Sequence, residues 1–177
     1  VYKRQAQEWF ERYSGFGKGF QRTVFGGVSC NPLHVGPVGA GANMAVRRNL
    51  MQEIGPFDDA LDAGTPTRSG GDHEMFSRIL RSGYRIIYEP DALSWHRHRR
   101  SWDELRQALR GYGIGVYAWW TRTLIEERDP GVLMMAAGWF RSRQGPTLAR
   151  ALLRRPGSVP LELSLAELGG CLAGPRA

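Results

Sequence analysis

The feature that most constrains the fold is the stretch from Ser69 to Gly83, which reads SGGDHEMFSRILRSG. Two glycines allow a sharp turn, and Asp72 then opens a predicted helix. The apolar residues that follow at helical spacing predict one buried face: Met75, Phe76, Ile79 and Leu80. Gly83 is placed to end the helix in a left-handed cap. Asp72 therefore lies at the positive end of a helix dipole, which suits an ionised carboxylate facing a cleft, and a plain helix N-cap is the alternative.

Composition narrows the partners and the compartment. The net charge of the 177 residues is +7, which favours an anionic partner such as a nucleotide, a phospholipid surface or a nucleic acid. Cys30 and Cys171 have no paired spacing, so we expect a reducing compartment and neither a zinc nor a redox motif. The longest apolar run, around residues 131–140, is well short of the ~20 residues that span a bilayer. Because the chain begins at Val1 without a visible leader, we expect a piece of a longer or processed protein with no signal peptide.

Hydrophobic periodicity and turn residues predict the remaining elements. We expect helices over residues 1–14, 47–54 and 130–143, and a strand over 84–88 that extends toward residue 95. A capping box of Ser101 and Glu104 starts a further helix that continues through residue 125. Small residues from Gly39 onward lead into a predicted short apolar strand, and residues 15–41 are otherwise loops around one or two short strands. The helix–strand–helix order predicts an α/β layer.

Two stretches near the end of the sequence leave the interpretation open. Arginines at 150, 154 and 155 alternate with leucines at 148, 152 and 153. Such a stripe can rest on an anionic membrane surface, but a core face with solvated arginines is the more common case. Residues 169–177 indicate no clear closing element.

Several motifs in order resemble the family 2 glycosyltransferases. The motifs are GANMAVRR at 41–48, IGPFD at 54–58, GGDHE at 70–74 with Arg78, YEP at 88–90, and the pair His96 and His98. The resemblance covers about residues 36–115 and implies an α/β fold, the C-terminal half of the GT-A fold. It divides the chain into residues 1–115, the C-terminal part of the catalytic domain, and 116–177, a helical C-terminal extension.

The resemblance also implies roles for individual residues. Asp72 matches the general base of inverting members, but Gly71 stands where the family commonly has Glu, so Glu74 is the reserve candidate. His96 matches a metal ligand, with His98 as the alternative. The sugar side of the donor pocket matches Gly41, Ala42 and Asn43, and Arg99 suits a phosphate.

The implied reaction transfers a hexose-type sugar from a nucleotide-diphosphate donor to an acceptor hydroxyl on a saccharide, a lipid-linked molecule or another acceptor. A carboxylate that removes the hydroxyl proton contributes on the order of 10²–10⁴-fold to such a transfer. A divalent metal, Mg or Mn, neutralises the leaving diphosphate in this family, mainly through an Asp-x-Asp motif that is missing from these 177 residues. We therefore expect a fragment that lacks the nucleotide-binding half and is inactive alone.

Two other functions fit the sequence. One is a basic module that binds nucleic acid or anionic lipid without catalysis, using the basic run at 96–100 and the nearby tryptophans. The other is a scaffold domain that keeps the fold and has lost the chemistry. For the transferase we expect no nucleic-acid partner, a cytoplasmic location at the inner face of the membrane, and peripheral membrane contact.

Overall fold

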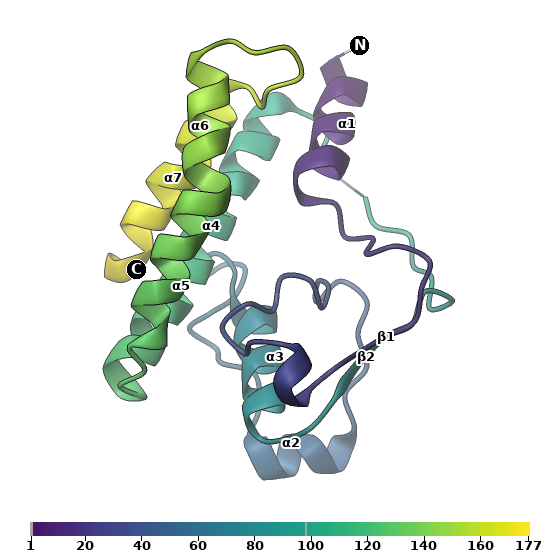
Figure 1. The fold of residues 1–177 in the computed structure, drawn as a ribbon. Coiled ribbons are helices and arrows are strands. Elements are labelled where there is room, and N and C mark those ends of the chain that lie inside the picture. Colours follow the sequence, from purple (N-terminus) through teal and green to yellow (C-terminus); the bar gives the residue numbers. More distant parts are fainter. Residues whose placement is uncertain (1, 98) are drawn as a thin grey trace.

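The computed structural model describes residues 2–97 and 99–177 of the chain. The helices after residue 101 group on one side, the N-terminal helix lies beside the first of them, and loops surround two further helices and a small sheet on the other side (Figure 1). The α-helices are α1 (Tyr2–Ser14), α2 (Arg48–Ile54), α3 (Gly71–Arg81), α4 (Trp102–Glu126), α5 (Gly131–Trp139), α6 (Gly145–Leu152) and α7 (Leu161–Ala173). Shorter helical turns are η1 (Gly27–Ser29), a π-turn η2 (Phe140–Gln144) that joins α5 to α6, and η3 (Gly174–Arg176). The strands are β1 (Thr23–Phe25) and β2 (Ile86–Tyr88).

The sheet of the described part of the chain consists of these two strands. They are antiparallel, and Val24 pairs with Ile87 at the centre of the register. The predicted strand at 84–88 is confirmed over its last three residues, but its extension toward residue 95 is wrong, because residues 89–97 contain no further strand. The fold is thus rich in helix, with an α/β component smaller than the sequence predicted. It is compatible with part of a glycosyl-transferring domain of the expected kind.

The predicted strand after Gly39 is wrong. Residues 39–47 form turns and irregular backbone. Polar groups of this segment bond to other parts of the chain in place of a neighbouring strand: the amide of Gly41 donates to Asp72, and the side chain of Asn43 donates to the Ala92 carbonyl. The segment is therefore held as a loop against the start of α3.

The central helix agrees with the sequence. The apolar residues at 75, 76, 79 and 80 are all buried on α3, as predicted. After the last turn, Gly83 adopts a φ of 81°, and its amide donates to the Leu80 carbonyl, so the left-handed cap is confirmed.

The capping box is also confirmed. Glu104 donates its amide to the Ser101 hydroxyl at 3.2 Å, and its carboxylate accepts from the Ser101 amide at 3.1 Å. The helix that starts there, α4, runs unbroken for 25 residues. It is continuous across residue 115, where the sequence placed a domain boundary; that division stays a prediction.

α7 supplies the closing element that the sequence did not indicate. It packs along α4 (Figure 1), and the two helices approach so closely that only glycine fits at the contact. A Cβ on Gly113 would overlap the Glu167 carbonyl, and one on Gly170 would overlap the Arg110 carbonyl. Glycine is unfavourable inside a helix, and this explains why the sequence around residue 170 does not read as one.

Two apolar clusters hold these elements together. One joins α3, α4 and α5 to the loop at 33–38 and contains Leu33, Val35, Val38, Leu61, Phe76, Leu80, Ala118, Trp119, Trp120 and Val132. The other joins α1, α4 and α7 and contains Ala6, Phe10, Leu105, Leu109 and Leu163. α4 contributes to both clusters. In the described part of the chain, each helix is too short or too polar to cross a bilayer.

Candidate functional site

Glycines place Asp72 at the start of α3. Gly70, with a φ of 111°, is the N-cap residue, so Asp72 is the second residue of the helix and not its cap. A Cβ on Gly70 would lie 2.8 Å from the carbonyl oxygen of Gly115 in α4, and one on Gly71 would overlap the Leu61 carbonyl. Gly70 therefore allows the loop to pass close to α4, and Gly71 allows the start of α3 to pass close to the backbone at Leu61.

The Asp72 carboxylate is held by three donors from two segments. Its Oδ2 accepts the Gly41 amide at 2.9 Å, and its Oδ1 accepts the His73 amide at 2.9 Å. The same Oδ1 lies 3.0 Å from Nδ1 of the His73 ring. Burial alone would raise the pKa of the Asp72 carboxyl, but the hydrogen bond and charge of His73, with the amides of Gly41 and His73, lower it from 3.8 to about 2. The carboxylate is therefore ionised at neutral pH.

The sequence reasoning gave no role to His73. The imidazole lies beside the Asp72 carboxylate, and its ring centroid is 6.2 Å from that of Trp119. A histidine directly after the acidic residue at a helix start was the signal that could have indicated this pair. The carboxylate and imidazole together can accept or pass on a proton.

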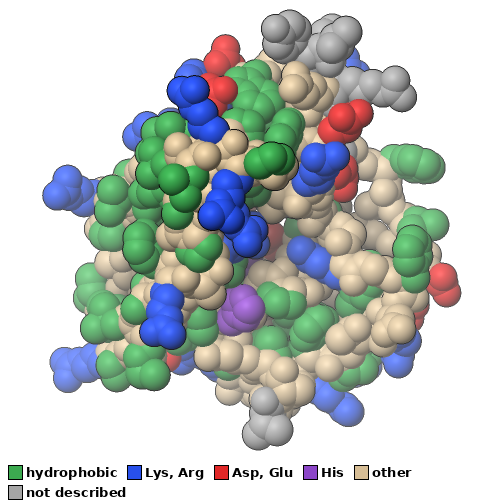
Figure 2. Space-filling view, turned by 45° about the horizontal axis from the view of Figure 1, so that its top comes forward, with side chains coloured by type: hydrophobic (Ala, Val, Ile, Leu, Met, Phe, Trp, Pro, Cys, Tyr) green, Lys and Arg blue, Asp and Glu red, His purple; other side chains and the backbone are tan. Residues whose placement is uncertain are grey.

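Asp72 and His73 line a cavity of about 1010 Å³. The surface view shows the hollow between the helical side and the loop side of the molecule (Figure 2). Of the predicted substrate-binding residues, Gly41, Ala42 and Arg99 lie in its wall. This volume is at the upper end of the range for small-molecule sites.

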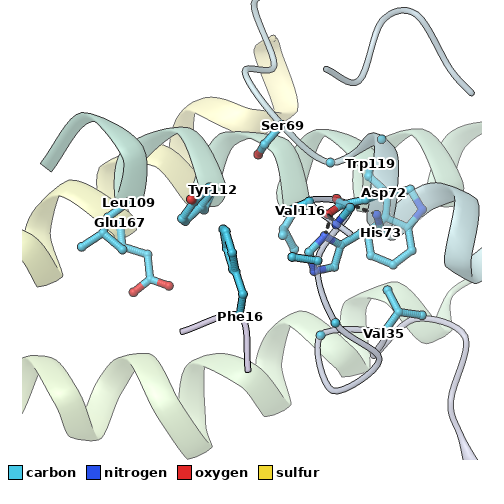
Figure 3. A pocket seen from close by; sticks show the side chains of 18 of the residues that line it. Phe16, Val35, Ser69, Asp72, His73, Leu109, Tyr112, Val116, Trp119 and Glu167 are labelled. Atoms are coloured by element: carbon cyan, nitrogen blue, oxygen red, sulfur yellow. Dashed lines mark hydrogen bonds and ion pairs between the residues drawn. The ribbon is translucent and has the colours of Figure 1, made fainter. Parts of the chain in front are cut away.

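The far end of the cavity contains a second carboxyl group. Figure 3 shows Asp72 and His73 at one end and Glu167 at the other, with Phe16 and Tyr112 between them. Glu167 accepts a hydrogen bond from the Tyr13 hydroxyl. Burial raises the pKa of the Glu167 carboxyl, although the Tyr13 hydroxyl and a nearby arginine act in the opposite direction. Sequence reasoning missed this group because α7 was not predicted.

The arginine near Glu167 is Arg143. Its guanidinium lies 5.0 Å from the ring centroid of Trp139 and 5.3 Å from that of Tyr13, and Nη2 donates to the Tyr13 carbonyl at 3.0 Å. All three residues line the cavity. The far end is therefore aromatic with both signs of charge, which suits a ligand that has apolar faces and polar groups.

The other predicted site residues lie elsewhere. Asn43 is exposed and lies outside the cavity wall. Glu74 forms a two-point ion pair with Arg78, at 2.9 and 2.6 Å, and also lies outside the wall. His96 is exposed, with its ring 4.9 Å from that of Phe16, and His98 lies outside the described residues. The structure brings Asp72, Gly41, Ala42 and Arg99 together around the cavity. Asn43, Glu74 and His96 are not part of the cavity wall.

The described residues do not fit a metal site by themselves. Among residues 2–97 and 99–177 there is no group of three or more histidine, cysteine, aspartate or glutamate side chains that could hold an ion. Both oxygens of Asp72 already accept hydrogen bonds from the protein. The predicted Mg or Mn was assigned mainly to a motif that this sequence lacks, and it stays a prediction.

A comparison with protein families defines the class to which this fold and site belong. The profile described as glycosyl transferase family group 2 matches residues 1–157. The chain therefore belongs to this family of glycosyl-transferring domains, and the resemblance seen in the sequence motifs is confirmed. No match was found among curated proteins or among solved structures.

Proposed function

We propose that this chain forms the acceptor side of an inverting transferase that moves a hexose-type sugar from a nucleotide-diphosphate donor to an acceptor hydroxyl, within a GT-A fold. In this reaction the acceptor oxygen bonds to the anomeric carbon, the bond from that carbon to the diphosphate oxygen breaks, and a base takes the hydroxyl proton. The observation that carries the proposal is the ionised Asp72 carboxylate in the wall of the cavity.

The Asp72–His73 pair offers two routes for the proton. Asp72 is ionised throughout the physiological range, but a carboxyl with a pKa of about 2 is a weak base. His73 lies within hydrogen-bond distance, so Asp72 can instead orient the imidazole, which then takes the proton at Nε2. We favour Asp72 as the direct base because its position in the motif matches the acidic residue to which that role is assigned in similar proteins.

The geometry also supports substrate-binding roles for the cavity wall. Gly41 holds its amide against Asp72 and brings the backbone of the loop at 39–44 to the carboxylate, where a sugar hydroxyl would have to lie. Arg99 adds a permanent positive charge to the wall, suited to a phosphate oxygen. In the scaffold alternative, the pair would serve only to hold the loop at 39–44 against the start of α3.

A cytoplasmic location is part of the proposal. Both cysteines are free thiols: Cys30 is partly buried, and Cys171 is buried. Burial raises the pKa of the Cys171 thiol to about 12, which leaves it unreactive. Free, unpaired thiols are typical of a reducing compartment.

The test replaces Asp72→Asn in the full-length protein and measures release of nucleoside diphosphate from sugar donors. We expect turnover to fall by at least ~100-fold, while the variant stays folded at neutral pH with a melting temperature about 4–8 °C lower, as the loss of about 2 kcal/mol from the ionised carboxylate requires. Asp91→Asn, an exposed aspartate outside the cavity wall, is the matched control and should keep full turnover. Unchanged turnover in Asp72→Asn would show that this carboxylate only organises the loop.

The pH profile of kcat/KM then assigns the proton. With Asp72 as the direct base, activity stays level down to about pH 4, because the carboxylate loses its charge only near its low pKa. A fall in activity that already occurs at a higher pH in the wild type, and is absent from the profile of His73→Gln, assigns the step to the imidazole.

A further inference from the structure

The long rod formed by α5, η2 and α6 has an outer face that is both apolar and basic. On this face Leu133, Met134, Phe140, Leu152 and Leu153 are each between 48 and 79% exposed. Between them the exposed positions are small or basic, including Ala137, Gly138, Arg141, Ala149 and Arg150. We call this set of residues the rod face.

The opposite side of the rod already has its partners. Val132, Gln144 and Ala151 are buried against the rest of the molecule, and Trp139 and Arg143 line the cavity. The buried side of the rod is therefore the side that carries Val132, Gln144 and Ala151. The rod face is a second, separate side, and its large side chains are exposed. In Figure 1 the rod runs along one side of the molecule, in front of α4 and α7, and its length is about 30 Å by the rise of a helix.

The charge of this segment has one sign. Between Pro130 and Leu161 the sequence contains five arginines, at 141, 143, 150, 154 and 155, and no aspartate or glutamate. The carboxylate that precedes it, Asp129, forms an ion pair with Arg81 at 2.7 Å, and Glu162, which follows it, accepts from the indole of Trp102 at 2.6 Å. In the surface view, green apolar and blue basic side chains intermingle over the side occupied by these helices (Figure 2).

We propose that the rod face lies on the surface of a bilayer that contains anionic phospholipid. An exposed row of leucine, methionine and phenylalanine flanked by arginines can bury its apolar atoms at the level of the headgroups while the guanidinium groups contact phosphate. Three arginines within 131–153 keep the rod from crossing the bilayer. This agrees with the finding that no helix among the described residues is long and apolar enough to span a membrane. Negative lipid supplies the charge complement that a neutral surface or a basic partner lacks.

This orientation has a consequence for the cavity. Trp139 and Arg143 face the cavity from the same rod whose other side meets the lipid. The far end of the cavity is therefore one helix away from the headgroups. The binding itself does not depend on the proposed transfer reaction, so it can be tested without any assay of activity.

The experiment is sedimentation of the purified protein with phosphatidylcholine vesicles, with and without phosphatidylglycerol. We expect binding to the anionic vesicles only, weakening with added salt. The double variant Arg141→Gln/Arg150→Gln should lower the partition constant by about 30-fold. This is the effect expected from removing the attraction of two arginines to an anionic lipid surface. Its matched control, Arg47→Gln/Arg48→Gln, removes the same charge from exposed positions around α2 and should bind as the wild type does.

A second pair of variants tests the apolar part. Met134→Gln/Leu152→Gln should weaken binding by at least about tenfold. The control Phe20→Gln/Leu93→Gln changes two side chains that are 98 and 87% exposed away from the rod and should leave binding unchanged. All eight positions are exposed, and circular dichroism is expected to show the same fold throughout.

Four outcomes overturn the proposal. Equal binding to neutral and anionic vesicles removes the charge argument, and equal losses in the rod and control variants show a non-specific effect of net charge. A dimer in light scattering that Met134→Gln/Leu152→Gln dissociates, without vesicle binding by the wild type, assigns the rod face to a second copy. Binding to RNA but to neither kind of vesicle assigns the arginines to nucleic acid.

Discussion

The contact between Gly115 and the loop before α3 predicts a large effect of a single methyl group. A Cβ on Gly115 would overlap both the carbonyl oxygen and the hydroxyl of Ser69, three residues before Asp72. Since one of these atoms is backbone, it cannot rotate away, and the loop or α4 must shift. Overpacking of this kind costs about 3 kcal/mol at the upper end of its range, and the better helix propensity of alanine returns about 1 kcal/mol. We expect Gly115→Ala to lower the free energy of unfolding by about 2 kcal/mol.

Gly111 provides the matched control one turn earlier in α4. A Cβ there would meet only the flexible side chain of Arg68, at 3.4 Å, an ordinary contact. Gly111→Ala should therefore stabilise the protein by up to about 1 kcal/mol. The two variants should differ by about 3 kcal/mol, or about 6–12 °C in melting temperature for a domain of this size, measured by urea and thermal unfolding. In the full-length protein Gly115→Ala should also lower turnover, since the loop carries Asp72. Equal stability of the two variants would refute the close contact.

Two further predictions concern the start of α3. Folding lowers the pKa of Asp72 from 3.8 to about 2. The ionised carboxylate therefore stabilises the fold by about 2 kcal/mol above pH 4, and this stabilisation is lost as the pH falls through 2. Urea unfolding between pH 5 and pH 2.5 should show the advantage of wild type over Asp72→Asn shrinking with acid, and a constant difference would contradict the shift. Arg78 donates to Glu74 and to the carbonyls of Ile54 and Pro56, so Arg78→Ala should cost about 2–4 kcal/mol in the same assay, with Arg78→Lys intermediate.

Local patterns predicted the elements that depend on local interactions. The face of α3, the cap at Gly83 and the capping box at Ser101 each follow from residues within one or two turns of each other. The order of the motifs along the chain also indicated the family, and the match over residues 1–157 confirmed it. Each motif alone is weak, but several of them in the same order are more specific. These predictions required no knowledge of what packs against what.

Long-range contacts explain what the sequence did not predict. Residues 44–46 are apolar, as in a short strand, but the Gly41 amide bonds to a carboxylate 31 positions later, and no strand forms there. Gly170 lowers the helix propensity of α7, yet the same glycine allows the contact with α4 that stabilises it. A property that disfavours an element locally can thus be the reason the element packs in the fold.

α4 connects both ends of the cavity to one rigid element. Gly115 receives the loop that carries Asp72, and Gly113 receives the backbone of Glu167 itself. Gly113 and Gly115 are two residues apart in α4, so their contacts lie about 3 Å apart along the helix axis. Gly113 faces α7, and Gly115 faces the loop at Ser69. Tyr112 and Trp119, on either side of residue 115, line the same cavity. The cavity therefore cannot be assigned to the part of the chain before residue 115 alone. The position of Asp72 and the position of the far wall both depend on the same turn of α4. We therefore expect a change that loosens α7 to alter the space in front of Asp72 as well.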